Sequence, residues 1–127
     1  MTTNWKHWIC FAWLCLIPFS AKAVTPMLAS DHFYSLFLNS DGSVWGAGSI
    51  INYSPGATSP VRLLQLPNVV AIAAGGNAYF ALQADGTLWA TGGNDAGLLG
   101  DGTTQSSSQP QRVPGLSGIK AISVYYH

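Results

Sequence analysis

The stretch NAYFALQADGTLWATG, residues 77–92, decides the fold of this chain. Its two short apolar runs, YFALQA and TLWAT, are separated by Asp85 and Gly86. Runs of this length with aromatic and branched residues are typical of strands, and Asp-Gly between two of them indicates a hairpin. A type I′ turn requires positive φ at both central residues, which this pair tolerates. We therefore predict a β-hairpin with a type I′ turn at Asp85 and Gly86.

The hairpin pattern also occurs earlier, in FYSLFLNSDGSVWGAG, residues 33–48. At an offset of 44 residues, Asp41 falls on Asp85 and Trp45 falls on Trp89. A glycosidase needs two carboxylates that face each other across a cleft, whereas these two occupy equivalent turn positions. We interpret both aspartates as turn residues. Both tryptophans are expected to pack between neighbouring blades, and the alternative is an exposed surface for a sugar or a partner.

A second comparison sets residues 59–73 over residues 109–123 at an offset of 50. Units of 44 to 50 residues have the length at which propeller blades recur. Both hairpin strands are apolar enough for burial on both faces, and no helical periodicity follows the N-terminal segment. We predict an all-β fold of β-propeller blades, built from antiparallel strands and hairpins. The repeats are expected at about 29–74 and 75–123, with a third repeat truncated.

The N-terminal segment, residues 1–23, has the features of a secretory signal peptide. Lys6 precedes an apolar run of eleven residues, ICFAWLCLIPF, and AKA follows it as a small-residue cleavage pattern. The run is about half as long as the roughly 20 residues that a membrane-spanning helix needs. We predict cleavage after Ala23 and a secreted or periplasmic protein, with no membrane contact after cleavage; a retained membrane anchor is the alternative.

The composition excludes several classes of function. Only 8% of the 127 residues are charged, the formal net charge is zero, and glutamate does not occur. Nucleic-acid binding is not expected, because it needs clustered Lys and Arg. Both cysteines lie within the predicted signal peptide. The segment 24–127 therefore has no disulfide, thiolate nucleophile or cysteine-ligated metal.

Residues 75–103, GGNAYFALQADGTLWATGGNDAGLLGDGT, resemble the repeat of the regulator of chromosome condensation family. That repeat reads approximately G-x-x-H-s-L-a-L-x-x-D-G-x-v-[WY]-x-W-G-x-N-x-x-G-Q-L-G-x-G. The matching positions are Gly75, Phe80, Leu82, Asp85, Gly86, Leu88, Trp89, Gly92, Asn94, Gly97, Leu99, Gly100 and Gly102. The resemblance covers about residues 29–123. It implies blades of a propeller, typically seven-bladed, that serves as a protein-binding platform.

The chain departs from that pattern at several positions. Ala78 and Tyr34 stand where the family usually has His, Leu98 replaces Gln, and Thr91 replaces Trp. The first repeat carries SIINYSPGATS in place of the glycine-rich loop. Family members include a guanine-nucleotide exchange factor and a secreted inhibitor of β-lactamases, but their contact residues cannot be matched to this chain.

The number of repeats is too small for a closed ring. Propellers need about 4 to 8 blades, and stacked repeats need about three or more to bury their faces. We expect further repeats to complete the ring, so that this sequence is a fragment of a longer propeller. The alternative is assembly of several copies of the chain.

The glycine-rich stretch WATGGNDAGLLGDGT, residues 89–103, allows three interpretations. A phosphate loop requires Lys and Ser/Thr after its last glycine, and here Thr103 follows Gly102 directly. A calcium loop would use Asn94, Asp95 and Asp101 as oxygen ligands, but the glycine register of such repeats is not met. We favour a wide turn whose glycines adopt positive φ.

Catalytic groups are sparse. Asp31 and His32 adjoin, but neighbouring residues in a strand point to opposite faces, so we do not expect them to form a dyad. No G-x-S-x-G motif accompanies the serines. We therefore predict no catalytic, cofactor-binding or metal-binding residues, no cofactor, and a protein that is not an enzyme.

These observations lead to one functional hypothesis. The chain is expected to be an exported protein-interaction scaffold whose protein partner the sequence does not identify. A first alternative is a secreted carbohydrate-binding or hydrolytic propeller whose site lies outside this sequence. A second alternative is a regulator of the guanine-nucleotide exchange type.

Overall fold

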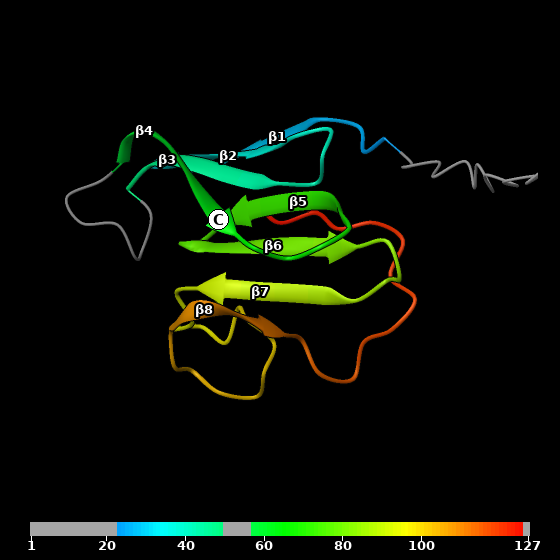
Figure 1. Ribbon diagram of the computed structural model, residues 1–127. Helices are drawn as coiled ribbons and strands as arrows, with labels where there is room; N and C mark the ends of the chain where they lie inside the picture. Colours follow the sequence, from blue (N-terminus) through cyan, green and yellow to red (C-terminus); the bar gives the residue numbers. More distant parts are fainter. Residues whose placement is uncertain (1–22, 50–56, 126–127) are drawn as a thin grey trace, which may run out of the picture.

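The computed structural model describes residues 23–49 and 57–125 (Figure 1). Within these ranges the chain forms strands and no helix, which confirms the predicted all-β class. The strands are β1 (Met27–Ser30), β2 (Tyr34–Leu38), β3 (Val44–Gly48), β4 (Ala57–Leu64), β5 (Val69–Gly75), β6 (Ala78–Gln83), β7 (Leu88–Gly92) and β8 (Ser107–Arg112). Residues 1–22 of the predicted signal peptide lie outside the described residues, so cleavage stays a prediction.

The strands form two four-stranded antiparallel sheets, ordered β1-β2-β3-β4 and β5-β6-β7-β8. Every pairing joins strands that are consecutive along the chain (Figure 1). The hairpin register repeats at the predicted offset, because Leu38 pairs with Val44 and Leu82 pairs with Leu88. The last strand of each sheet, β4 or β8, carries a proline, which an outer edge tolerates because proline cannot donate to a ladder.

The sheets do not begin where we predicted the repeats to begin. We placed a boundary between residues 74 and 75, but β5 belongs to the second sheet and pairs with β6. Gly76 and Asn77 join these strands, both with φ of 62°. This pair forms the tight two-residue connection that a type I′ turn provides. The sequence repeat and the sheet are therefore out of phase by one strand.

The hairpins at Asp41 and Asp85 are confirmed, but the predicted turn type is wrong. Positive φ occurs at Gly42 (79°) and Gly86 (83°) but not at the aspartates. The amide of Gly42 donates to the carbonyl of Asn39, and the amide of Gly86 donates to Gln83, both at 2.9 Å. These are three-residue loops in which a type I turn precedes a glycine with positive φ.

The two sheets pack against each other through one shared hydrophobic cluster. Its buried members are Tyr34, Leu36, Leu38, Val44 and Leu64 from the first sheet and Val69, Ile72, Ala74, Tyr79 and Ala81 from the second. In addition, the hydroxyl of Tyr34 donates to the carbonyl oxygen of Ala78 at 2.7 Å. Tyr34 replaces the histidine of the family repeat, and here it joins the first sheet to the second.

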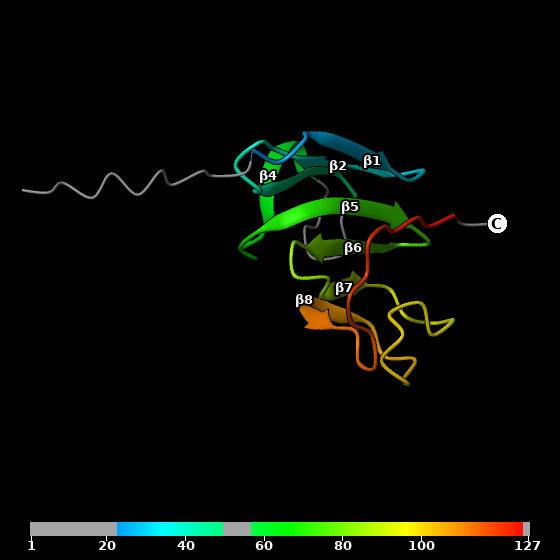
Figure 2. The same cartoon turned by 90° about the vertical axis from the view of Figure 1, so that its right-hand side faces the viewer.

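A second cluster covers the other face of the second sheet. Its buried members are Ala73, Ala78, Phe80, Ala90, Leu99 and Val113. Ile122 and Val124 pack on this cluster, so the segment after β8 crosses that face, as the red chain shows in Figure 2. This segment was predicted to open a third repeat, and its apolar side chains occupy the face that such a strand would cover.

No helix within the described ranges has the length and hydropathy needed to cross a membrane.

Candidate functional site

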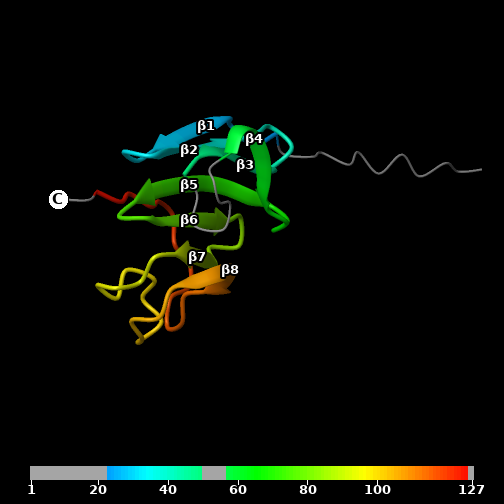
Figure 3. The same ribbon diagram turned by 90° about the vertical axis from the view of Figure 1, so that its left-hand side faces the viewer.

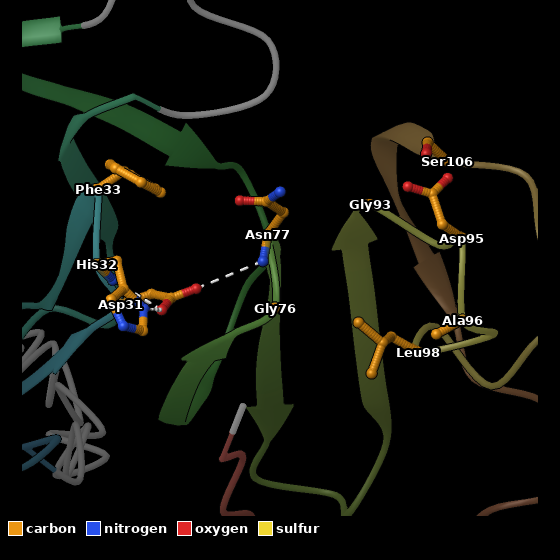
Figure 4. A pocket seen from close by; sticks show the side chains of 10 residues that line it. All are labelled: Asp31, His32, Phe33, Gly76, Asn77, Gly93, Asp95, Ala96, Leu98 and Ser106. Carbon is orange, nitrogen blue, oxygen red and sulfur yellow. Dashed lines mark hydrogen bonds and ion pairs between the residues drawn. The ribbon is translucent and has the colours of Figure 1, made fainter. Parts of the chain in front are cut away.

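Three connections project to the same side of the molecule and form what we call the loop face (Figure 3). They are the β1–β2 turn, the β5–β6 turn and the β7–β8 loop. Between them lies an open depression with a volume of about 410 Å³. Its lining residues are Asp31, His32, Phe33, Gly76, Asn77, Gly93, Asp95, Ala96, Leu98 and Ser106 (Figure 4).

The β1–β2 turn presents two large rings to solvent. The side chain of His32 is 72% exposed, and Phe33 is 71% exposed. Phe33 aligns with Asn77 at the 44-residue offset, so both residues occupy turn tips. An exposed aromatic ring beside a depression is a feature that protein interfaces use as an anchor.

Asp31 orients this turn, and our expectation for the Asp31–His32 pair is wrong. Its Oδ1 accepts hydrogen bonds from the backbone N–H of His32 at 2.7 Å and pairs with Nδ1 of the same residue at 2.8 Å. Its Oδ2 accepts a longer bond, 3.4 Å, from the amide of Asn77 (Figure 4). The two residues lie in a turn between β1 and β2, so the alternation of strand side chains does not apply.

The environment of Asp31 affects its pKa in two opposing ways. Desolvation by burial raises the pKa, whereas the hydrogen bonds from His32 and Asn77 lower it. The net result is a pKa below the ordinary value, because the bonds that stabilise the carboxylate prevail.

Nucleophilic catalysis at the Asp31–His32 pair would require a hydroxyl beside the base. A base must lie within hydrogen-bond reach of the hydroxyl that it activates. Ser106 also lines the depression, but Figure 4 places it on the opposite wall beside Asp95. Its hydroxyl instead accepts a bond of 3.3 Å from the amide of Asn94.

Asn94 holds the β7–β8 loop closed from inside. Its side chain is fully buried, and its Oδ1 accepts a hydrogen bond of 2.9 Å from the amide of Leu99. Its Nδ2 donates to the carbonyl oxygens of Thr103 at 3.0 Å and Gln105 at 3.1 Å. Leu99 is itself buried in the second cluster, so the loop is anchored to the sheet. This arrangement agrees with the predicted wide turn.

The aspartates of the Asp-Gly pairs serve their own turns. In each pair the aspartate Oδ1 accepts a hydrogen bond of 2.8 Å from the backbone amide two residues later; the three aspartates are Asp41, Asp85 and Asp101. Hydrogen bonds from Ser43 are the main cause that lowers the pKa of Asp41, and hydrogen bonds from Thr87 do the same for Asp85. For Asp101, the backbone bond from Thr103 is the largest cause and also lowers the pKa. No group of three or more His, Cys, Asp or Glu residues gathers within the described ranges.

The two repeated tryptophans are not core residues, contrary to our expectation. Both are half-buried, and neither belongs to the two clusters. The indole N–H of Trp45 donates to the hydroxyl of Ser43 at 3.0 Å, and that of Trp89 donates to Oε1 of Gln83 at 2.7 Å. Each indole therefore bonds to a residue at the base of its own hairpin turn.

The residues that organise the loop face were not predicted from the sequence. Phe33, Asn77 and Asn94 were not assigned these positions, although Phe33 and Asn77 align at the repeat offset. Asn94 matches the family repeat and was also weighed as a calcium ligand, and neither interpretation placed its side chain inside the loop. Its place inside a run of glycines was the available signal, because a loop with few side chains needs one to pair its backbone groups.

Comparison with protein families decides the identity of the repeats. Two models described as "Regulator of chromosome condensation (RCC1) repeat" match residues 69–98 and 85–126. The chain carries RCC1 repeats. This result confirms the family that the sequence resembles, over two overlapping segments that include the second sheet.

Several curated proteins share this sequence pattern. Human E3 ubiquitin-protein ligase HERC2 is 31% identical over 122 residues, which covers 87% of this chain and 2% of that protein. The mitochondrial RCC1 domain-containing protein RUG3 of Arabidopsis thaliana is 26% identical over 119 residues, covering 85% of this chain and 27% of that protein. The RCC1-repeat chain thus spans about a quarter or less of these relatives.

Solved structures share the fold. Prp20p from Saccharomyces cerevisiae superposes with a TM-score of 0.63 at 19% identity, covering 72% of this chain and 26% of that one. Human WBSCR16 gives a TM-score of 0.59 at 24% identity, covering 70% of this chain and 25% of that one. At these identities the likeness establishes the arrangement of the two RCC1-type sheets.

Proposed function

We propose that this chain is an exported protein-interaction scaffold that binds its partner through the loop face and acts without catalysis. One observation carries the proposal: His32 and Phe33 are 72% and 71% exposed at the rim of a depression of about 410 Å³. A phenyl ring held in water by a hydrogen-bonded turn is pre-organised for burial against a partner.

The geometry of the depression favours binding over chemistry. Asp31 fixes the orientation of the turn, and Asn94 fixes the loop on the other side. Neither arrangement aims a nucleophile and a base at one point. A rigid rim with a partly apolar floor, to which Leu98 and Ala96 contribute, is suited to a protein surface.

The relatives support a protein as the class of partner. The structure of Prp20p was reported with its binding properties to Gsp1p and histones, and yeast RCC1 (Prp20) was solved as a partner of Kap60. Those partners belong to the yeast protein. Because we propose that this chain is exported, we expect its partner to be an extracytoplasmic protein.

The experiment places a photo-crosslinking phenylalanine analogue at position 33 of the full chain in the producing cells. The matched control carries the analogue at Leu116, which is 39% exposed beyond β8. A discrete protein adduct from position 33 only is expected. Equal adducts from both positions, or none, would contradict the proposal.

Export is tested on the same material. Mass spectrometry of the chain recovered outside the cytoplasm should give Val24 as the first residue. A chain recovered intact from the cytoplasm would contradict export while leaving the loop-face result to be judged separately.

A further inference from the structure

The depression on the loop face has a carboxylate on each of two opposite walls (Figure 4). Asp31 reaches it from the β1–β2 turn, and Asp95 reaches it from the β7–β8 loop. The two connections are held separately, the first by the hydrogen bonds of Asp31 and the second by the buried side chain of Asn94. A group that enters the depression therefore meets two negative charges, one on either side.

Asp31 is nearly removed from water but keeps one oxygen available. Its side chain is 10% exposed. Oδ1 is engaged by the backbone and the ring of His32, whereas the bond that Oδ2 accepts from the amide of Asn77 is 3.4 Å long. Hydrogen bonds from N–H to oxygen are usually about 2.7–3.2 Å long. A shielded carboxylate gains from a closer, positively charged donor, so Oδ2 is the acceptor that Asp31 offers to a ligand.

Phe33 adds an aromatic face on the same turn. Its ring is exposed and lines the depression on the side of Asp31 (Figure 4). A cation within about 6 Å of the centre of such a ring is attracted to its face. A guanidinium group suits this combination, because it is planar, stacks on a ring and has five N–H donors for carboxylate oxygens.

Positive charge lies at the other ends of the strands. Among the described residues, the Lys and Arg residues are Arg62, Arg112 and Lys120. The charges of Arg62 and Arg112 act on the carboxylates of the two hairpin turns, Asp41 and Asp85. Lys120 lies next to the second of these turns, because the preceding amide donates to the carbonyl of Gly86. The described part of the loop face thus presents carboxylates without Lys or Arg beside them, which attracts a cation.

The carboxylate and the ring are particular to the first of the two turn tips. At the 44-residue offset, Asp-His-Phe at residues 31–33 falls on Gly-Gly-Asn at residues 75–77. The second tip connects its strands without a carboxylate or a phenyl ring. The repeat itself therefore requires neither group at this position.

We infer that the depression binds an arginine side chain of the protein partner, with the guanidinium group between Asp31 and Asp95 and against the ring of Phe33. The inference rests on the proposed function and specifies the chemistry of the partner. An acidic partner surface would meet like charge at this site, so the two carboxylates also select against it.

The experiment titrates the isotope-labelled full chain with a capped peptide, Gly-Ser-Arg-Ser-Gly, and follows backbone amide signals by NMR. Peptide concentrations up to about 10 mM detect a contact of millimolar affinity. The amides of Phe33, Asn77 and Asp95 should shift together and give one dissociation constant. A second peptide has citrulline in place of arginine, which keeps the shape and removes the charge. It should bind at least about tenfold more weakly.

Substitutions test each wall of the site. Asp95→Asn removes the charge of an exposed side chain, and Phe33→Leu removes the aromatic face but keeps an apolar group. Each should raise the dissociation constant of the arginine peptide by about threefold. Asp31→Asn keeps an oxygen acceptor for His32 and should weaken binding in the same direction. Asp85→Asn makes the same change of charge at the far ends of the strands and should leave the dissociation constant unaltered.

The outcomes separate this inference from the proposed function. Binding that needs arginine and Asp95 but not Asp85 supports the inference. No shift with the arginine peptide, equal binding of both peptides, or equal losses in Asp85→Asn and Asp95→Asn would overturn it. A crosslinked protein at position 33 without discrimination between the peptides leaves the scaffold role standing and removes the arginine site. Discrimination between the peptides without a crosslinked protein supports the arginine site and removes the scaffold role.

Discussion

The first and second sheets share a backbone plan but differ at the ends of their strands. Both have the Asp-Gly hairpin turn and a glycine with strongly positive φ, Gly48 at 104° and Gly92 at 118°. After each of these glycines the next amide donates to the turn across the sheet, to Phe33 at 2.8 Å and to Asn77 at 2.9 Å. The turn tips themselves differ, because one exposes His32 and Phe33 and the other is Gly76-Asn77.

The difference shows what the repeat preserves. Glycine is kept in both sheets where a Cβ would meet the backbone, at Gly48 and Gly92, whereas the turn tips carry different residues. The first tip is free to carry rings because its residues have negative φ. The similarity of the sheets at these glycines therefore reflects backbone geometry, and the turn tips are where the two sheets differ.

The largest effect is expected where the two sheets are most alike. A Cβ at Gly92 would lie 2.4 Å from the carbonyl oxygen of Asn77, and a Cβ at Gly48 would lie 2.3 Å from that of Phe33. Gly92→Ala and Gly48→Ala should each lower the free energy of unfolding by about 3 kcal/mol or more, because backbone must move and the φ is strained. Urea denaturation measures the change.

Gly102→Ala is the control for this pair. Its φ is 81°, but no atom lies within 4 Å of the added Cβ. The variant should cost only the strain of positive φ, about 1 kcal/mol. If Gly102→Ala and Gly92→Ala lowered the free energy of unfolding equally, crowding by backbone atoms would not explain why both sheets keep this glycine.

The next effect concerns a feature of the second sheet. Asn94→Ala removes a buried amide that pairs with the amide of Leu99 and two carbonyl oxygens. Leaving such groups unpaired should lower stability by about 3 kcal/mol and increase hydrogen exchange at the Leu99 amide. Asn39→Ala, at an exposed amide in the first hairpin, should change stability by less than about 0.5 kcal/mol. A loop that keeps its exchange protection in Asn94→Ala would contradict the role of this side chain.

The smallest effect tests the link between the sheets. Tyr34→Phe removes the hydroxyl that bonds to Ala78 and should lower stability by about 1 kcal/mol at neutral pH. Burial raises the pKa of Tyr34 above its ordinary value of 10.0. The folded state therefore holds the phenolic proton more tightly than the unfolded state, and this contribution is lost as pH rises above about 10.

The pH dependence supplies the measurement. Plots of the free energy of unfolding against pH should converge above pH 10 for the wild type and Tyr34→Phe. Above this pH the unfolded wild type releases the Tyr34 proton, so the wild type loses the stabilisation that the variant lacks. Tyr125→Phe, at a residue that is 85% exposed, should leave the curve close to that of the wild type. Parallel curves for the wild type and Tyr34→Phe would show that the hydroxyl is not held in the interior.

The sequence predicted the parts of the fold that depend on local patterns. The strands around Asp41 and Asp85 follow from apolar runs and turn residues, and the 44-residue offset reproduces the register. The turn type was wrong because Asp-Gly also fits the last two positions of a three-residue loop. The sheet that β5 joins did not follow from the repeat, because sequence similarity does not show which neighbour β5 pairs with.

The candidate site was less accessible to prediction. The hydrogen bond between Asp31 and His32 depends on a turn that the alternation rule for strands does not describe. The burial of Asn94 and Leu99 depends on how a glycine-rich loop folds back on its sheet. The bond of Asp31 arises from local turn geometry and the burial of Asn94 arises from the fold of its loop, and residue spacing along the chain encodes neither.

The visible sequence repeat begins one strand later than the second sheet. This offset determines where the architecture can be lengthened or divided. A break between residues 74 and 75 would separate β5 from the strand with which it pairs. A break between Leu64 and Val69 leaves every ladder intact, because no strand of one sheet pairs with a strand of the other. Duplication, recombination or protein engineering that adds whole sheets should therefore tolerate junctions at 65–68, even though the visible sequence repeat begins at residue 75.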